Sequence, residues 1–594
     1  MILQALKEYY DRKANDPAGD IAPEGFEKKE IPFIVVIGPD GKFVNLTDTR
    51  EKSGVKRGKQ YLLPRSSSRS GSRSYETTFL LWDHIGYLFG YPENDPKAIK
   101  QHQTWLDSLN QLPEKLKEDE GVKAIILFYE KGSVDVVKKQ TAWRDCIRIP
   151  SCNMTFSLAE EDTPIPCRLS VQEYVRESAS RKTVTDEDEH SDEKMFSNCL
   201  ITGEYGEIAR IHARTPINKD TKSLVAFQKN SGYDSYGKDQ CYNAPVSKKT
   251  EFAYTTGLNT LLKSKGQRIQ IGNATTVFWS AKASPFENDV FYFFSDPPKD
   301  DPDRNTEAVK ALYQTIWSGS YTVPEENTRF YALGLSPNSA RISVRFWHVG
   351  TVREMGKRLK QHIDDLAIVH GERTDAALPM RRLLLSVASQ EKEENVPPNI
   401  AGEMMRAILE GTPYPQTLLQ AAIRRVRAEQ SKKDKKTGKS APNVSYQRAA
   451  LIKACLNRAL RFNNLDNEKE MTMNLDLENT NIGYRLGRLF AALEKIQSDA
   501  NPGLNATIRD RFYGAASSTP VTVFGNLMRL SNYHISKLEK EKKGLAIIRK
   551  QLIAEIMGAI SDFPLHLNLA DQGRFAIGYY HQSQDMWSRK TVNP

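Results

Sequence analysis

The sequence has few cysteines, and their spacing excludes two common ways of stabilising a fold. Six cysteines in 594 residues are too few for a disulfide framework in a chain of this size. No Cys-x-x-Cys pair occurs, and no nearby histidine completes a zinc site beside Cys146 and Cys152. We therefore expect neither a disulfide scaffold nor a structural metal.

Long apolar runs are also missing. No run approaches the ~20 residues that a membrane-spanning helix needs. The first residues, MILQALKEYYDRK, lack the pattern of a signal peptide and are typical of a short amphipathic helix. These absences predict a cytosolic protein without a membrane partner.

Catalytic motifs are absent as well. None of the ten histidines precedes an aspartate, and the sequence has no H-x-H, H-E-x-x-H, G-x-S-x-G or dinucleotide fingerprint. Gly438–Ser440 matches the end of a phosphate-binding loop, but Lys433 occupies the position of its first glycine. His362, Asp364 and Asp365 have the spacing of a solvated helix face. We expect no enzyme, no cofactor and no catalytic metal.

Positive charge is abundant and unevenly distributed. The formal net charge is +10, and residues 50–73 hold eight Lys or Arg against the single Glu51. Glycines and serines interrupt this segment, so it forms no regular face, and its ordering requires a compensating anion. Two interpretations remain: a contact with nucleic-acid backbone, or a disordered solubilising loop. The candidate backbone contacts in this segment are Lys56, Arg57, Lys59, Arg65, Arg69 and Arg73.

The hydrophobic pattern changes from mixed to helical near residue 350. Residues 31–46 predict a β-hairpin around the turn at 39–41. Further strands are predicted at Gly121–Glu130, Ile208–Arg214, Thr275–Ala281, Val290–Ser295 and Arg329–Leu335. In the next segment, Arg341 and Arg345 alternate with Ile342, Val344 and Phe346, which predicts either a cationic sheet face that binds nucleic-acid backbone or an ordinary solvated face.

Beyond residue 350 the chain is predicted to be helical. We expect an α+β fold of several domains: a mixed part with antiparallel strands at 1–350, a helical region at 351–465, and a helix bundle at 473–594. A basic linker at 431–440 interrupts the helical region. The bundle is predicted from the apolar stripe that begins at Ile482 and from short connections between helices.

The stretch Phe227–Leu262 joins a polar loop to an amphipathic helix. Ser247 is the expected N-cap, and Tyr254, Leu258 and Leu261 share one face. The cations of the loop suit phosphates, its amides suit base edges and its tyrosines suit stacking. The alternative is an ordered loop whose tyrosines cover the core. The candidate DNA-reading residues are Lys229, Asn230, Tyr233, Ser235, Tyr236, Lys238, Gln240 and Asn243.

This stretch also carries a resemblance to a known family. Its segments are SYGKDQ, NAPVS and FAYTTGLNTLL, and further segments in the same order are TTFLLWDHIGYLFG, CLITGE, TVFWSAK, ARISVRFWH and DQGRFAIGYYHQ. Together they resemble the large subunit of the type I-C CRISPR surveillance complex, Cascade. No single segment identifies the family. The resemblance depends on the set of segments together, which spans nearly the whole chain.

The resemblance implies a role and a set of partners. The large subunit recognises the protospacer-adjacent motif in double-stranded DNA, while RNA pairing reads the rest of the target. It would assist R-loop formation and recruit a separate helicase-nuclease that cuts. The implied partners are CRISPR RNA, target DNA, the backbone subunits, the RNA-processing subunit and small subunits, all in a prokaryotic cytoplasm.

Systems of this type make their small subunit from an internal start in the large-subunit gene. Lys469–Glu470 can be encoded as AAGGAG, a ribosome-binding sequence placed two codons before Met473. We expect Met473 to start a product that ends with the bundle and carries its own core. Its cations Arg485, Arg488, Arg509 and Arg511 line either a path for a DNA strand or a solvated surface.

Two other classes remain open. A stand-alone metal-dependent nuclease would cut DNA by itself with a divalent metal. A structural protein scaffold would show no steep loss of DNA binding with salt.

Overall fold

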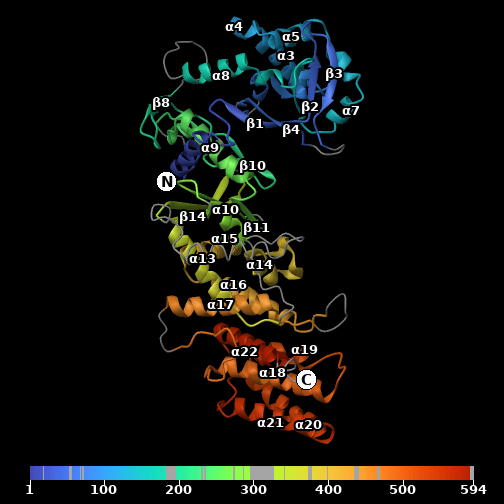
Figure 1. Cartoon of the computed structure of the whole chain (residues 1–594), viewed down its shortest axis with the longest axis vertical. Helices are drawn as coiled ribbons and strands as arrows, with labels where there is room; N and C mark the ends of the chain where they lie inside the picture. The colour runs from blue at the N-terminus through green and yellow to red at the C-terminus, as the bar shows by residue number, and fades with distance from the viewer. Residues whose placement is uncertain are drawn as a thin grey trace. The chain divides into compact units, whose positions relative to one another are not determined.

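The computed structural model divides the chain into two compact units, Met1–Thr260 and Leu261–Pro594 (Figure 1). It describes residues 1–17, 19–51, 57–66, 69, 73–181, 195–228, 232, 236–271, 274–284, 286–294, 327–339, 341–371, 378–397, 399–433, 441–463 and 468–588. The fold is α+β, as the sequence predicts: among these residues the strands lie before residue 352, and helices follow. The division near residue 260 differs from the predicted boundary at 350.

The first unit contains a four-stranded sheet in the order β3-β2-β6-β5. Strands β2 and β6 are parallel, and the other neighbours are antiparallel. The β2–β3 pair is the predicted hairpin. The bounds are β2 Phe33–Ile37, β3 Phe43–Asp48, β5 Trp82–His84 and β6 Asn153–Leu158.

Both faces of the central strand β2 are covered. Phe33 and Val35 pack into a helical core, whereas Ile34 packs beneath a two-stranded ribbon formed by β1 and β4. This double burial explains the continuous apolar run of β2. The ribbon strands are β1 Phe26–Ile31 and β4 Lys59–Pro64; the helices are α2 Ile85–Phe89, α3 Pro96–Asn110, α4 Glu114–Lys117, α5 Glu120–Glu130, α6 Val134–Lys138, α7 Trp143–Cys146 and α8 Leu169–Arg181.

The predicted strand at Gly121–Glu130 is wrong, because this segment is helix α5. The Asp119 carboxylate accepts hydrogen bonds from the Gly121 and Val122 amides at 2.9 and 3.1 Å, which caps the first turn. Val122, Ile125 and Phe128 are then buried at helical spacing. An apolar run of this length fits a strand or a buried helix, and the cap decides between them.

The rest of the first unit consists of short strands around two helices. Ile208 makes one bridge to Ser247, and regular strand begins again only at Arg214, so most of the predicted strand Ile208–Arg214 is wrong. Ser247 caps helix α9, as predicted, through the Thr250 amide. The elements are α1 Ile2–Ala14, β7 Phe196–Asn198, β8 Tyr205–Glu207, β9 Arg214–Ile217, β10 Asp220–Ser223, the 3-10 turn η3 Gln240–Asn243 and α9 Lys248–Lys263.

The second unit begins with an antiparallel sheet in the order β11-β12-β13-β14. The predicted strand Val290–Ser295 is wrong for residues 290–294, because these residues belong to helix α10. Ser284 accepts a hydrogen bond from the Phe286 amide, and Glu287 accepts one from the Ser280 amide at 2.7 Å, so both favour a helical turn. The elements are β11 Arg268–Ile271, β12 Ala274–Ser280, α10 Phe286–Phe294, β13 Arg329–Pro337 and β14 Ile342–Thr351.

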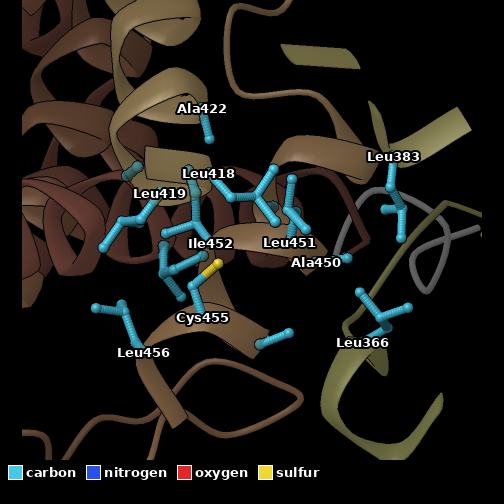
Figure 2. Close-up of a cluster of buried hydrophobic side chains, with 14 of the residues drawn as sticks. Leu366, Leu383, Leu418, Leu419, Ala422, Ala450, Leu451, Ile452, Cys455 and Leu456 are labelled. Carbon is cyan, nitrogen blue, oxygen red and sulfur yellow. The ribbon is translucent and has the colours of Figure 1, made fainter. Parts of the chain in front are cut away.

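The helices of the second unit surround a large hydrophobic core, and a second, smaller cluster lies around Ile496 and Leu538. Figure 2 shows the centre of the large core, where Leu418 and Leu419 of α16 lie beside Ile452 and Cys455 of α17. The core extends from Ile269 to Met586, without a break at the predicted boundary near 465. The helices are α13 Val352–Leu366, α14 Met380–Val387, α15 Ile400–Glu410, α16 Gln416–Ala428, α17 Tyr446–Phe462, α18 Ile482–Ala500, α19 Ile508–Ala516, α20 Phe524–Glu541, α21 Lys543–Met557 and α22 Leu569–Ser588.

Helices α18 and α22 pack unusually closely. A Cβ atom on Gly487 would lie 2.0 Å from the Phe575 carbonyl oxygen, and one on Gly578 would lie 2.0 Å from the Tyr484 carbonyl oxygen. Only glycine allows the two backbones to approach in this way. The glycines therefore fix the α18–α22 pair as the centre of the bundle.

The segment QHIDDL does not form the solvated helix face that its spacing suggests. His362 and Asp365 are buried in α13. His362 Nδ1 and the Tyr414 hydroxyl share a hydrogen bond, and Asp365 pairs with Arg461. Burial, reinforced by the nearby positive charge of Arg458, lowers the pKa of His362 to about 3. These groups belong to the core.

Candidate nucleic-acid interface

The loop that precedes α9 presents an aromatic ring to solvent. Tyr236 is 99% exposed and has a positive φ of 52°, and Gly237 follows with a φ of 73°. Two consecutive left-handed residues form a tight turn that displays the ring at its tip. Lys238 follows and is partly exposed. Of the other predicted DNA-reading residues, Lys229, Asn230, Tyr233 and Ser235 lie outside the described residues.

The amides of this loop hold the loop itself. The Asn243 side-chain amide donates to the carbonyl oxygens of Lys238 and Gln240 at 2.8 and 3.0 Å. The Gln240 side-chain oxygen accepts a hydrogen bond from Arg210 at 3.3 Å. Two candidate base readers therefore position the turn, and Tyr236 and Lys238 are the described candidates that face solvent.

A buried polar cluster surrounds the first turns of α9. Glu251 of α9 accepts hydrogen bonds from the Ala213 amide at 2.8 Å and from Arg65 at 3.2 Å. His212 Nδ1 and the Tyr254 hydroxyl lie 2.5 Å apart. Burial lowers the pKa of His212, and the carboxylate of Glu251 only partly offsets this. Burial thus favours the uncharged form of the His212 imidazole in this cluster.

Two of the predicted backbone contacts are structural cations. Arg65 bonds Glu251 and lies 4.7 Å from the centre of the Phe252 ring. Arg69 forms a two-pronged pair with Asp83, whose side chain is fully buried, and its guanidinium sits between the rings of Phe79 and Tyr87. Their placement corrects the expectation of free surface arginines.

Other cations of the same segment do face solvent. Arg57 and Lys59 are exposed, and Lys56 lies outside the described residues. Arg73 is 83% exposed and approaches Glu76 no closer than 3.8 Å. The basic segment therefore divides into anchors that hold the fold and side chains that an anion can reach.

Helix α3 adds cations that sequence reasoning missed. Lys97 and Lys100 are exposed near its beginning, and Lys100 Nζ lies 5.3 Å from the centre of the Tyr75 ring. Tyr75 belongs to the 3-10 turn η1, Ser74–Glu76, which contacts α3. We call Arg73, Tyr75, Lys97 and Lys100 the η1–α3 patch. The sequence feature that could identify this patch is the pair of lysines in PKAIK. They are three residues apart and therefore lie on one face of a helix.

The η1–α3 patch borders a histidine that is not cationic at neutral pH. Burial lowers the pKa of His84 to about 4, and the positive charges of Arg69 and Lys97 lower it further in the same direction. The charge of the patch therefore comes from its arginine and lysines.

The predicted cationic sheet face is interrupted by a β-bulge. Gly334 faces Phe346 and Leu335 faces Val344, so Arg345 is an extra residue on β14. Its guanidinium donates to the Ser336 hydroxyl at 2.6 Å, while Arg341 is exposed just before the strand. The sheet itself is apolar on both faces, with Phe330 and Leu333 as buried examples from each.

Four arginines of the bundle are predicted to line a path for a DNA strand. Three of them lie inside the bundle. Arg488 is fully buried and forms two hydrogen bonds to Glu555 at 3.0 and 2.7 Å. Arg485 donates to the Asn479 carbonyl oxygen, and Arg509 is buried near Glu494. Their burial corrects the expected surface placement, and Arg511 alone of the four is exposed.

The segment around Met473 is held against the helical core. The Asn457 side chain clamps Met471 through its amide and its carbonyl oxygen, both at 2.8 Å. The Val369 amide donates to the Met473 carbonyl oxygen at 2.9 Å, and the Met473 residue is 51% exposed. Helix α17 also covers α22, because Gly573 faces Ile452 and Leu456. The bundle after Met473 thus shares core with α17, contrary to the expectation that it carries its whole core.

Within the described ranges there is no cluster of three or more His, Cys, Asp or Glu that could hold a metal ion. All six cysteines are free thiols. In the same part of the chain, no helix is both long and apolar enough to cross a membrane.

The fold and these surfaces define a basic, two-unit α+β protein with exposed cations beside aromatic rings, a combination suited to a polyanionic partner. The family model described as CRISPR-associated protein (Cas_Csd1) matches residues 6–587. The chain belongs to this family, which confirms the resemblance to the large subunit of type I-C Cascade. A comparison with curated proteins found no match.

Proposed function

We infer that this Cascade-type subunit binds double-stranded DNA at the protospacer-adjacent motif and has no catalytic step of its own. The observation that carries this inference is Tyr236, a fully exposed ring beside Lys238 on a loop whose other amides hold it in place. Hydrogen bonds that hold residues 238–243 in place reduce the conformational entropy that this part of the loop would lose on binding. Lys238 supplies a phosphate contact, and Tyr236 contacts the bases or sugars of the duplex end.

The η1–α3 patch would hold the neighbouring backbone in register. Its cations are exposed and lie on a helix and a 3-10 turn, so they contact phosphates without reading sequence. Arg57, Lys59, Arg341 and Arg345 extend the set of candidate backbone contacts. The subunit would then assist R-loop formation on CRISPR RNA and recruit a helicase-nuclease for cleavage, in the prokaryotic cytoplasm.

The test uses the assembled complex and short duplexes with randomised motif positions. Tyr236→Ala with Lys238→Ala should leave assembly intact and weaken binding to the preferred motif by about tenfold, since one good base contact contributes ~1–3 kcal/mol. Tyr205→Ala is the matched control, because Tyr205 is 72% exposed in the same unit but outside the loop. Equal binding by both variants and the parent would remove the loop from the interface.

Two measurements separate this function from its rivals. Cleavage of DNA by the purified chain with a divalent metal would favour a nuclease. DNA affinity that does not fall with salt would favour a protein scaffold, because neutralised phosphates release counterions.

A second product from Met473 remains part of the proposal. Translation of the native gene should yield a separate polypeptide of residues 473–594. Met473→Leu with synonymous recoding of Lys469–Glu470 should abolish it. Since α17 covers Gly573 in the full chain, we expect the free product to be less stable alone than within the full chain. Its persistence after recoding would refute this start.

A further inference from the structure

One edge of the sheet in the second unit carries a cluster of three aromatic rings that the proposed function does not use. Residues directly opposite in an antiparallel pair share a face. Phe330 and Phe346 therefore lie on the face that packs into the helical core. Trp279, Tyr331 and Trp347 lie on the opposite face.

These three rings hold one another in place. Tyr331 and Trp347 are parallel within 8°, with ring centres 5.4 Å apart, and Trp279 lies 5.6 Å from Trp347. Trp279 and Tyr331 are buried, whereas Trp347, on the edge strand β14, is partly exposed. Two buried rings thus fix the orientation of a third that solvent reaches.

The bulge at Arg345 extends this surface along the strand. Because Leu335 faces Val344 and Gly334 faces Phe346, Val344 shares a face with Trp347 instead of with Phe346. Val344 is 42% exposed and Val349, two residues after Trp347, is 47% exposed. The apolar side chains therefore flank the indole on both sides. Without the bulge, Val344 and Trp347 would point to opposite faces.

The charges around this surface suit an anion. The strands β11 to β14 contain no aspartate or glutamate but include Arg268, Arg329 and Arg345. Arg329 is exposed and alternates with Tyr331, so it lies on the face of the three rings.

Two of the described carboxylates near β14, Glu354 and Glu410, approach from the other face. Glu354 and Glu410 both raise the pKa of His348, although burial lowers it overall. His348 lies opposite Ala332, on the helix-covered face, and a Cβ atom on Gly350 would meet Glu354 on that side. The sheet thus separates these two carboxylates from the three rings.

We propose that Arg329, Val344, Trp347 and Val349, the Trp347 platform, bind unpaired nucleotides of DNA. One base stacks on the indole, and Arg329 contacts the adjacent phosphate. Bases of any sequence stack on an aromatic ring, so this contact is tolerant of sequence. The flanking valines offer no hydrogen-bond partner to a ribose 2′-hydroxyl, which favours DNA over RNA. The site goes beyond the proposed duplex contact, since it takes a strand that has already been unpaired.

The first test maps the contact directly on the full-length chain. A thymidine oligonucleotide that carries one 5-iodouracil is photocrosslinked to the protein, and the modified peptide is identified by mass spectrometry. A crosslink at Trp347 supports the platform. Efficient crosslinks that map only to other peptides overturn it. This test needs no variant and does not depend on duplex binding at Tyr236, so the two proposals fail separately.

The second test measures affinity for the same oligonucleotide by fluorescence anisotropy. Trp347→Leu keeps an apolar side chain but loses the ring, and about tenfold weaker binding is expected. Tyr533→Leu is the matched control, because Tyr533 is 73% exposed on α20, and it should bind within about twofold of the parent. Equal loss in both variants would overturn the assignment.

Two further arms complete the design. If Trp347→Leu does not fold, Trp347→Phe retains a stacking ring and should bind within about threefold of the parent. A uridine oligonucleotide of the same length should bind more weakly than the DNA. Tighter binding of RNA would overturn the choice of DNA, and affinity that does not change with salt would indicate an apolar protein partner instead.

Discussion

Arg69 in the first unit and Arg73, four residues later, show how differently one basic segment uses its charge. Arg69 lies between two rings and pairs with the buried Asp83, whereas Arg73 is 83% exposed. The bundle of the second unit repeats the contrast, with Arg488 buried against Glu555 and Arg511 exposed. In a chain with a net charge of +10, many arginines thus hold the fold together, and only the exposed ones are available to a nucleic acid.

The largest effect is expected from removing the anchor in the first pair. Arg69→Met keeps an apolar side chain between Phe79 and Tyr87 but leaves the buried carboxylate of Asp83 without its cation. Breaking a buried ion pair from one side costs about 3–5 kcal/mol. Urea unfolding should report this loss for Arg69→Met.

Arg73→Met is the matched control for this experiment. Its side chain is solvated, so its unfolding free energy should stay within about 0.5 kcal/mol of the parent. Similar stabilities for the two variants would remove the distinction between anchor and exposed cation in this segment.

A smaller loss is expected in the bundle. Arg488→Met removes hydrogen bonds to Glu555 and Gln582, but the Glu555 side chain is 41% exposed and keeps access to water. We expect a destabilisation of about 2–3 kcal/mol, less than for Arg69→Met. Thermal and urea unfolding should resolve this loss from the control Arg511→Met, which should be nearly neutral. A neutral Arg488→Met would mean that packing alone stabilises the bundle.

The cost of removing Arg69 should depend on pH. Burial raises the pKa of Asp83, and Arg69 partly opposes this, so the pKa rises further in Arg69→Met. A carboxyl group with a raised folded-state pKa stabilises the fold when protonated, and that contribution is lost as pH increases through the folded pKa. The deficit of the variant relative to the parent should therefore shrink with acidification. Urea unfolding between about pH 5 and about pH 8 measures it; a deficit that grows at low pH would contradict the assignment to Asp83.

The contrast between anchors and exposed cations was beyond a reading of the sequence, although much of the local structure was not. The N-cap at Ser247, the hairpin of β2 and β3, and helices in the region 351–465 follow from local signals and are confirmed. Arg488 and Glu555 are 67 residues apart, and nothing in the spacing of either identifies the other. Partners of this kind are set by tertiary packing.

The same limit applies to the candidate interface. Tyr236 was identifiable because glycine and polar residues predict a loop, and its exposure agrees with that prediction. The sequence predicts that Gln240 and Asn243 read bases, but both side chains bond the protein itself. The Asn243 amide donates to two backbone carbonyl oxygens, and the Gln240 side-chain oxygen accepts a hydrogen bond from Arg210. The short apolar runs of α5 and α10 fit a strand as well as a buried helix, so the sequence pattern alone predicts strands. Hydrogen bonds at the start of each run favour the helix instead.

The last prediction concerns exposed cations alone and should leave stability unchanged. Arg73, Lys97 and Lys100 of the η1–α3 patch are replaced together by glutamine. If each of the three contacts a phosphate, the triple variant releases fewer counterions on binding, and the slope of log affinity against log salt should fall by about 0.9 per lost contact.

The matched control replaces Lys115, Lys123 and Lys139 by glutamine. These lysines are also exposed in the first unit, and their replacement removes the same net charge. Affinities of the assembled complex for a motif-bearing duplex, measured over a salt series, compare the two triple variants. A patch that binds DNA lowers the slope in the first variant and not in the second, whereas equal slopes would show that overall charge, and not this patch, attracts the duplex.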